Sequence, residues 1–191
     1  MHTLDEYLDG LTAALAGVNR DDFDALVEVL ERAQAEDRWV YIGGNGGSAA
    51  TASHMVNDLV KAPADAAGCR PIRAVGLADG VPLMTAFAND LEYAQAYARQ
   101  IEAYGRPGDV LIVLSGSGNS ANVVEAARTA RARGMTVVAM TGFDGGRLKA
   151  LADVHVHVPC DCMAHVEDAH LVIEHAVVEV LKTALADAPK P

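Results

Sequence analysis

The sequence predicts an α/β fold, a three-layer αβα sandwich around a five-stranded parallel sheet with two leading helices. Two observations support this fold. From residue 37 onwards, short apolar runs alternate with helical patterns, which is typical of strands and helices that build a parallel sheet. Right-handed crossovers then place helices on both faces of the sheet. A length of 191 residues suits one domain with a sizeable core. We therefore expect a single domain over 1–191, with N-terminal helices over 1–36 and the αβα core over 37–191.

The individual elements follow from periodicity. Apolar residues recur at helical spacing in two leading segments, first Leu4, Tyr7, Leu8, Leu11 and Leu15, then Phe23, Leu26, Val27 and Leu30. Strands are predicted over RWVYIG (38–43), IRAVGL (72–77), DVLIVLS (109–115), TVVAMTG (136–142) and DVHVHV (153–158). Helices are predicted up to about Lys61, over 91–103, over Ser120–Arg133 and from about Ala164.

Composition argues against several classes of function. The formal net charge is −11, whereas a broad nucleic-acid surface needs a basic field, so no nucleic acid is expected as a partner. The chain has no run of 18 apolar residues, so we expect no membrane-spanning helix. An acidic start without an apolar signal region, together with three cysteines, favours the cytoplasm.

Two glycine- and serine-rich loops follow strands of the predicted sheet, at the end where parallel sheets bind ligands. These are GGNGGSAATASH (43–54) and SGSGNS (115–120). Glycines allow a ligand to approach the backbone, and helix starts and hydroxyls supply donors that bind phosphate without a basic side chain. Tight turns with serine N-caps are the alternative interpretation. Because neither loop completes a dinucleotide or Walker motif, a small phosphorylated ligand is favoured over a nucleotide at these loops.

Two residue pairs are candidates for chemistry near the loops. His54 and Asp58 lie four residues apart on one helix face, a spacing shared by metal-binding pairs and by ordinary surface pairs. Asn89 and Asp90 could hold sugar hydroxyls, or could cap the helix expected over 91–103.

The segment HVHVPCDCMAHVEDAHLVIEH (155–175) is rich in metal-binding residue types. His155 and His157 alternate with valines, so they are expected on the solvated face of an edge strand. The C-x-C pair does not have the usual spacing of a structural zinc site. On the final helix, Glu167, His170 and Glu174 lie within about 60° of one another, with His170 expected in the core. His175 lies about 80° from Glu167 and about 12 Å along the axis, so the two can share a metal only through an irregular first turn or through different subunits.

Together, GNGGSAATASH, GRPGDVLIVLSGSGNS, MTVVAMTGFDGG and the final E-D-A-H-x₄-H resemble the SIS (sugar isomerase) family, with the phosphoheptose isomerases as its nearest members. The resemblance covers nearly the whole chain. It implies a homotetramer with active sites shared between subunits. It also implies conversion of sedoheptulose 7-phosphate, a phosphorylated seven-carbon sugar, to D-glycero-D-manno-heptose 7-phosphate.

The resemblance also implies roles for individual residues. Substrate and phosphate binding are implied for Asn45, Gly46, Gly47, Ser48, Asn89, Asp90, Ser115, Gly116, Ser117, Ser120 and Glu167. Zinc binding is implied for His54, Asp58, Glu167 and His175. An aldose–ketose isomerase moves a proton between C1 and C2 through an enediol, which needs an acid and a base. Asp58 and His175 are the predicted pair, with Zn²⁺ polarising the oxygens.

The chain departs from the family pattern within the site. Asp58 stands where the family has Glu, Glu167 where it has Gln, and Gly116 where it has Thr. The family's arginine after the metal helix is missing, and Lys61 or Arg70 could replace it. A SIS isomerase of another sugar phosphate is therefore the first alternative. A non-catalytic SIS adaptor or sugar-phosphate-binding protein is the second, although such adaptors have lost the last histidine that this chain keeps.

Overall fold

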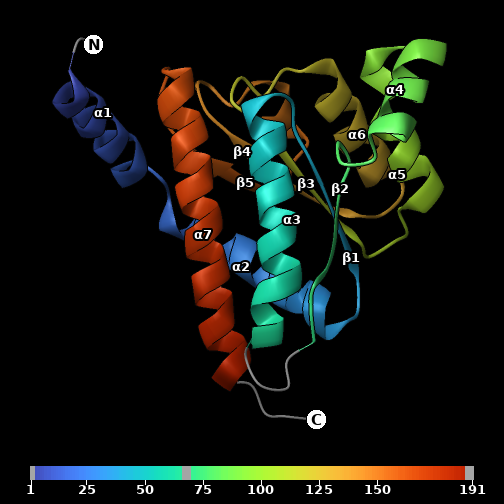
Figure 1. Cartoon of the computed structure of the whole chain (residues 1–191), viewed down its shortest axis with the longest axis horizontal. Coiled ribbons are helices and arrows are strands. Elements are labelled where there is room, and N and C mark those ends of the chain that lie inside the picture. Colours follow the sequence, from blue (N-terminus) through green and yellow to red (C-terminus); the bar gives the residue numbers. More distant parts are fainter. Residues whose placement is uncertain (1–2, 66–69, 188–191) are drawn as a thin grey trace.

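The computed structural model describes residues 3–65 and 70–187, with the backbone alone for 62–65 and 185–187. A five-stranded sheet of order β2-β1-β3-β4-β5 lies between two layers of helices (Figure 1). All four neighbouring strand pairs are parallel. The strands are β1 (Trp39–Gly43), β2 (Arg73–Gly76), β3 (Val110–Ser115), β4 (Thr136–Thr141) and β5 (Val154–His157). The predicted αβα sandwich and its five strands are confirmed.

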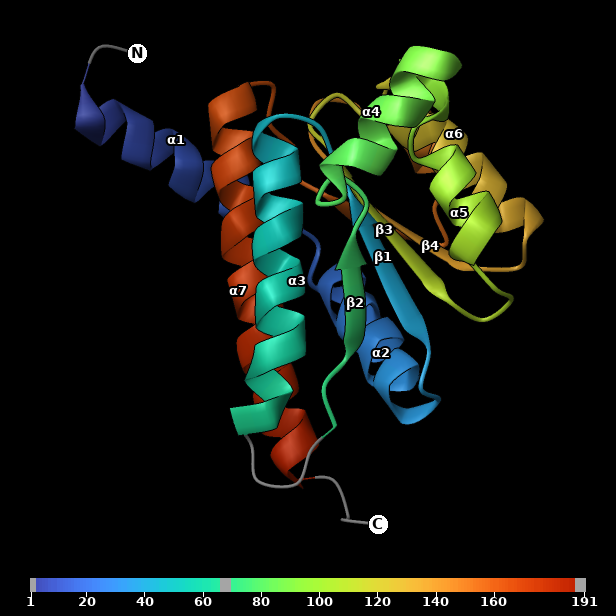
Figure 2. The same ribbon diagram turned by 45° about the vertical axis from the view of Figure 1, so that its right-hand side comes forward.

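Helices cover both faces of this sheet. The α-helices are α1 (Leu4–Ala16), α2 (Arg20–Ala35), α3 (Gly47–Asp65), α4 (Val81–Asp90), α5 (Ala98–Tyr104), α6 (Ala121–Ala132) and α7 (Met163–Asp187), with short 3₁₀ turns η1 (Tyr93–Gln95) and η2 (Gly146–Ala150). Helices α2, α3 and α7 pack on one face, and α5 and α6 on the other (Figures 1 and 2). In the part of the chain that is described, no helix is both long and apolar enough to cross a membrane.

The central strand shows why the sequence folds this way. Ile112 and Leu114 of β3 belong to the core beneath α2, α3 and α7, whereas Leu111 and Val113 belong to the core beneath α5 and α6. Successive side chains of a strand point to opposite faces. A continuous apolar run therefore fits a strand that is buried on both sides, as in parallel sheets.

Helix α1 projects from the body of the molecule (Figure 2). Its N-cap is Thr3, whose hydroxyl accepts a hydrogen bond from the Glu6 backbone N–H. The periodic apolar residues predict a packed stripe, yet Leu4 is 70% exposed and Leu8 is also exposed. The helix is therefore correctly predicted, but within one chain only part of its apolar stripe is buried.

The predicted helix over 91–103 is wrong in its boundaries. The chain forms α4 first, then the η1 turn, and only then α5. Pro82 lies in the first turn of α4, where its fixed φ favours a helix start. Leu91 then leaves the helical conformation at φ −118° and ψ −98°. Asn89 and Asp90 consequently end α4 and do not cap the next helix.

His170 lies in the core, as predicted, and is 1% exposed. Burial lowers its pKa to about 4, and the nearby Thr141 backbone only partly opposes the shift. Since an unfolded chain takes up the proton near the ordinary value of 6.5, stability is expected to fall as pH drops from about 6.5 towards 4, by about 3 kcal/mol in total. Urea unfolding at about pH 7.5 and about pH 5 should show a smaller loss for His170→Leu than for the parent chain. Equal losses in the two proteins would contradict this prediction.

Candidate functional site: a phosphate pocket and a metal-type cluster

The two glycine–serine loops meet at the carboxyl edge of the sheet. Their strands, β1 and β3, are hydrogen-bonded neighbours with Gly43 opposite Val113, so the loops that follow them lie side by side. Between them is a small cavity of about 120 Å³. It is lined by Asn45, Ser48, Leu114, Ser115, Gly116, Ser117, Ser120, Met163 and Glu167. Most of the substrate-binding residues predicted from sequence are thus brought together.

Two helices begin at this cavity, and their N-terminal ends give it a partial positive charge. Helix α3 begins at Gly47, which follows Gly46 at φ 56°, and α6 begins directly after Ser120. The free N–H groups of these first turns favour an anion, and the described residues that line the cavity include no lysine or arginine. The Glu167 carboxylate already lies at the start of α3, because a Cβ built on Gly47 would come within 2.6 Å of its Oε2.

Gly116 has a steric explanation. A Cβ at this position would collide with the Sδ of Met163, the first residue of α7. The Met163 side chain thus occupies the space in which a side chain at position 116 would begin, so glycine fits there and threonine does not.

An amide pair orients Asn45 in the cavity. The side chains of Asn45 and Asn122 exchange two hydrogen bonds, each of 2.8 Å. The Tyr93 hydroxyl donates a third bond of 2.7 Å to Oδ1 of Asn45. Asn122 is buried in α6 at 1% exposure. Neither Asn122 nor Tyr93 was predicted from the sequence. Asn122 lies in the first turn of α6, where a polar residue is indistinguishable in the sequence from a helix cap.

Asn89 and Asp90 are not part of the cavity lining. Both are exposed at the end of α4, where the Asn89 amide donates to Oδ1 of Asp90 at 2.9 Å. Their predicted contact with sugar hydroxyls remains a prediction.

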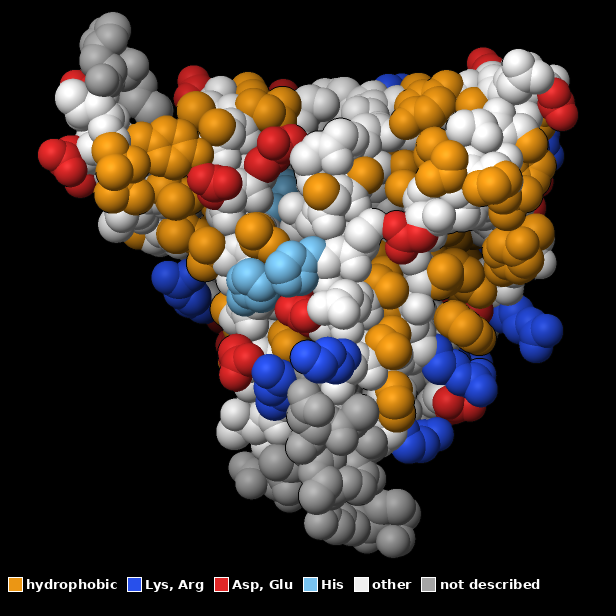
Figure 3. Space-filling model, in the orientation of Figure 1, with side chains coloured by type: hydrophobic (Ala, Val, Ile, Leu, Met, Phe, Trp, Pro, Cys, Tyr) orange, Lys and Arg blue, Asp and Glu red, His pale blue; other side chains and the backbone are white. Residues whose placement is uncertain are grey.

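A second group of polar side chains lies further along α3 and α7. One ligand atom from each of His54, Asp58, Glu174 and His175 can be chosen so that all lie within 4.8 Å of one another. Nε2 of His175 is 3.2 Å from Nε2 of His54 and 3.9 Å from Oδ2 of Asp58. Figure 3 shows pale-blue histidine side chains together on this face, with a red carboxylate beside them. Two imidazoles and two carboxylates are ligand types that suit Zn²⁺.

Glu174 is the residue of this cluster that the sequence analysis missed. It is completely buried, and neither carboxylate oxygen has a hydrogen-bond partner among the described residues. Burial, followed by the neighbouring Asp58, raises its pKa to about 7. Its Oε2 lies 3.5 Å from Nε2 of His175. A buried carboxylate without hydrogen bonds is costly unless a cation or a proton neutralises it, so the cluster fits a bound metal. The only signal in the sequence was the helix face that Glu174 shares with Glu167 and His170.

The structure does not bring Glu167 to this cluster. Helix α7 is continuous from Met163, so its first turn is regular and Glu167 remains about 12 Å from His175 along the axis. Arg70 is also elsewhere, because its guanidinium donates to the carbonyls of Gln34 and Ala35 near the end of α2. Within one chain, Arg70 does not take the place of the family's arginine.

The remaining histidines of the 155–175 segment make protein contacts. His155 is hydrogen-bonded to Oγ1 of Thr141 at 2.7 Å, and His157 to the carbonyl of Phe143 at 2.9 Å. The two rings stack on edge strand β5. They are half-buried, which is more enclosed than the solvated face predicted for them. Cys160 and Cys162, the cysteines whose side chains are described, are free thiols in the loop before α7.

Comparisons with known proteins identify the family of the chain. The SIS domain family matches residues 6–142. The chain is 37% identical to the phosphoheptose isomerase of Aromatoleum aromaticum over 182 residues, covering 91% of this chain and 84% of the relative. It is 42% identical to that of Mycobacterium tuberculosis over 151 residues, covering 76% and 74%. The structure of the phosphoheptose isomerase of Neisseria gonorrhoeae superposes with a TM-score of 0.85 at 30% identity, covering 94% and 96%. The chain therefore belongs to the SIS-domain family, in its group of phosphoheptose isomerases.

Proposed function

We propose that the chain interconverts sedoheptulose 7-phosphate and D-glycero-D-manno-heptose 7-phosphate through an enediol. The observation that supports this most is that α3 and α7 carry both parts of the site. The phosphate pocket lies at the start of α3 near Gly47, and His54 follows seven residues later, about 10 Å along the axis. This separation suits a long sugar whose phosphate and reacting carbons are at opposite ends.

In this proposal the two serine loops hold the phosphate. The N–H groups of Gly46, Gly47 and Ser48 and the hydroxyls of the 115–120 loop act as donors. They compensate for the acidic chain and for a pocket whose lining, in the part of the chain that is described, has no basic residue. Glu167 at the pocket wall accepts hydrogen bonds from sugar hydroxyls, and Asn89 and Asp90 complete the hydroxyl contacts. This assignment makes Glu167 a specificity residue.

Asp58 and His175 are the proposed acid–base pair. Their side chains are close enough to act on the two adjacent carbons of one substrate, and both are partly exposed. An imidazole exchanges protons near neutral pH, as required to move a proton between C1 and C2. His54, Asp58 and His175, joined by Glu174, are the residues that would hold Zn²⁺. When bound, the ion would polarise the substrate carbonyl and hydroxyl.

The assembly and location of the enzyme are also proposed. Exposed apolar residues on α1 and α7, such as Leu8 and Val180, support burial against other copies in a homotetramer. The alternative that the sequence prediction left open, in which Glu167 of one subunit reaches the metal cluster of another, is the contradicting outcome of the Glu167→Gln experiment in the Discussion. The free thiols of Cys160 and Cys162 are in keeping with the expected cytoplasmic location.

A turnover assay with sedoheptulose 7-phosphate, with and without a chelator, tests the proposed activity. We expect the aldose 7-phosphate to form and the chelator to slow its formation. If no aldose forms under either condition, the heptose assignment is wrong, and other sugar phosphates should be assayed next. If turnover is unaffected by complete metal removal, the zinc part of the proposal is wrong.

Replacing Asn122 tests whether the amide pair positions Asn45. Asn122→Leu is expected to raise KM by up to about 30-fold, because the Asn45 amide loses two hydrogen bonds worth about 1 kcal/mol each. The expected effect on kcat is smaller, since Asn122 touches Asn45 and not the reacting carbons. Asn122→Asp keeps the acceptor and should recover part of the affinity. If Asn122→Leu lowers kcat while KM stays unchanged, the positioning role is incorrect.

A further inference from the structure

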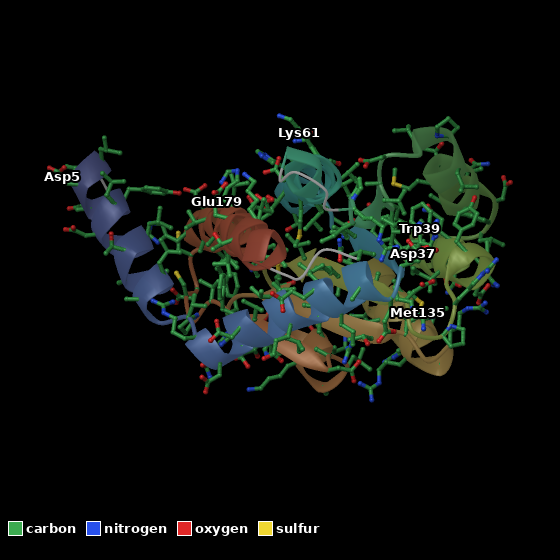
Figure 4. The ribbon with its side chains drawn as sticks, turned by 90° about the horizontal axis from the view of Figure 1, so that it is seen from below. Asp5, Asp37, Trp39, Lys61, Met135 and Glu179 are labelled. Atoms are coloured by element: carbon green, nitrogen blue, oxygen red, sulfur yellow. The ribbon has the colours of Figure 1, made fainter. Side chains whose placement is uncertain are left out.

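A second, larger cavity lies at the opposite edge of the sheet. It has a volume of about 590 Å³, within the usual range for small-molecule sites. Trp39 and Arg73, which face one another as the first residues of β1 and β2, line it. These are the amino ends of the strands, whereas the phosphate pocket is at the carboxyl ends. Figure 4 views the molecule from this edge and labels Asp37 and Trp39. The cavity is therefore separate from the proposed isomerase site.

Aromatic side chains form one wall of this cavity. Trp39 is 40% exposed and Tyr104 is 54% exposed, so both rings are open to a ligand. The Trp39 and Tyr41 rings have centroids 6.3 Å apart and planes 28° apart. The Arg73 guanidinium carbon lies 5.6 Å from the centre of the Trp39 ring. Arg73 therefore lies over the Trp39 ring in a cation–π contact, and a planar aromatic group would stack on the part of the indole that stays exposed.

Positive charge gathers around the same cavity. Arg38, Arg73, Arg106 and Arg133 line it, against two acidic residues, in a chain of net charge −11. Of the acids, Asp109 is buried and accepts hydrogen bonds from the backbone N–H groups of Trp39 and Arg106.

The arginines differ in how far they are engaged. Arg73 pairs with Asp37, the second acid of the cavity, at 3.3 Å. Arg38 pairs with Glu36 at 3.2 Å and also donates to the Pro107 carbonyl. Arg133 donates to the Gly105 carbonyl. Among the described residues, no hydrogen bond or ion pair engages the exposed Arg106 guanidinium. Arg106 is thus available to bind an anion, and guanidinium groups bind phosphate by paired, charge-assisted hydrogen bonds.

We propose that this cavity binds a nucleoside diphosphate. The base would stack on Trp39, and the phosphates would bind Arg106 with help from the neighbouring arginines. An aromatic wall beside a cluster of arginines matches a ligand that is both planar and multiply charged better than a simple sugar phosphate or a neutral metabolite. This site goes beyond the isomerase reaction and does not depend on it.

Trp39 provides a direct test, because it is the only tryptophan of the chain. Its fluorescence is measured while the full-length protein is titrated with ADP, GDP or adenosine, without any sugar phosphate. Pyrophosphate, which has no ring to stack on Trp39, is titrated as a competitor of the diphosphate that quenches. We expect at least one of the diphosphates to quench saturably, with a Kd below about 1 mM. Adenosine lacks the phosphates that would bind Arg106, and pyrophosphate lacks the base that would stack on Trp39. Each should bind about tenfold more weakly than the diphosphate or not at all.

Two arginine variants separate the cavity from general charge effects. Arg106→Ala is expected to weaken binding of the diphosphate about tenfold. Arg128→Ala is the matched control, because Arg128 pairs with Glu125 on the surface of α6 and does not line the cavity. The proposal is overturned if no diphosphate quenches Trp39, if pyrophosphate binds as tightly as ADP and GDP, or if both variants lose affinity equally. Heptose phosphate turnover by Arg106→Ala, measured in parallel, should remain at the parent level.

Discussion

Replacing His175 with alanine is expected to lower kcat by about 10²- to 10⁴-fold, the usual contribution of a general acid–base group. Nε2 of His175 lies within 4 Å of a side-chain atom of each of the other three residues of the cluster, His54, Asp58 and Glu174. Because half of its side chain is exposed, the fold should tolerate the change. Initial rates with sedoheptulose 7-phosphate over a range of concentrations give kcat and KM separately.

His157→Ala is the control for this experiment. His157 is a histidine of the same segment, but it lies on β5 and contacts the Phe143 carbonyl. We expect its removal to leave kcat unchanged. A His175→Ala protein that retains parent activity and a folded circular dichroism spectrum would exclude His175 from the acid–base pair.

Replacing Glu174 with glutamine is expected to weaken zinc binding by about 10- to 100-fold or more, which exceeds the effect expected of most surface charges. Glu174 places a buried carboxylate without hydrogen-bond partners beside His54, Asp58 and His175. Glutamine keeps its shape but removes the negative charge. Competition with a chromophoric chelator measures the zinc affinity without any need for turnover. Because Glu174 makes no hydrogen bond among the described residues and glutamine carries no buried charge, the variant should be at least as stable as the parent chain when metal is absent.

Glu167→Gln is the matched comparison and restores the residue type of the family pattern. Glu167 lies in the phosphate pocket next to Gly47, so this change should leave zinc affinity unchanged. It should instead lower KM, because it removes a negative charge beside the phosphate. The opposite result, in which Glu167→Gln weakens zinc binding and Glu174→Gln does not, would show that Glu167 reaches the metal from a neighbouring subunit.

The sheet and its loops were predictable because their signals are local. A strand such as β3 is apolar throughout because both of its faces are buried, and a glycine–serine loop follows it directly in the chain. The order of strands β1 and β3 then places both loops in one pocket. The helix predicted over 91–103 failed because Pro82 starts a helix earlier than the polar residues Asn89 and Asp90 indicate.

By itself, the sequence determined the αβα architecture, the positions of the two glycine–serine loops and the pairing of His54 with Asp58 on one helix face. Only the tertiary structure decided which residues of α7 meet that pair. Helical periodicity places Glu167 and Glu174 on nearly the same face, so sequence alone cannot separate them. Helix α7 packs parallel to α3, so the two glutamates lie at different positions along the helix axes. Glu167 lies beside Gly47, and Glu174 lies beside Asp58. The physical reason is that a helix rises about 1.5 Å per residue, so two residues seven positions apart on a rigid helix are about 10 Å apart along its axis.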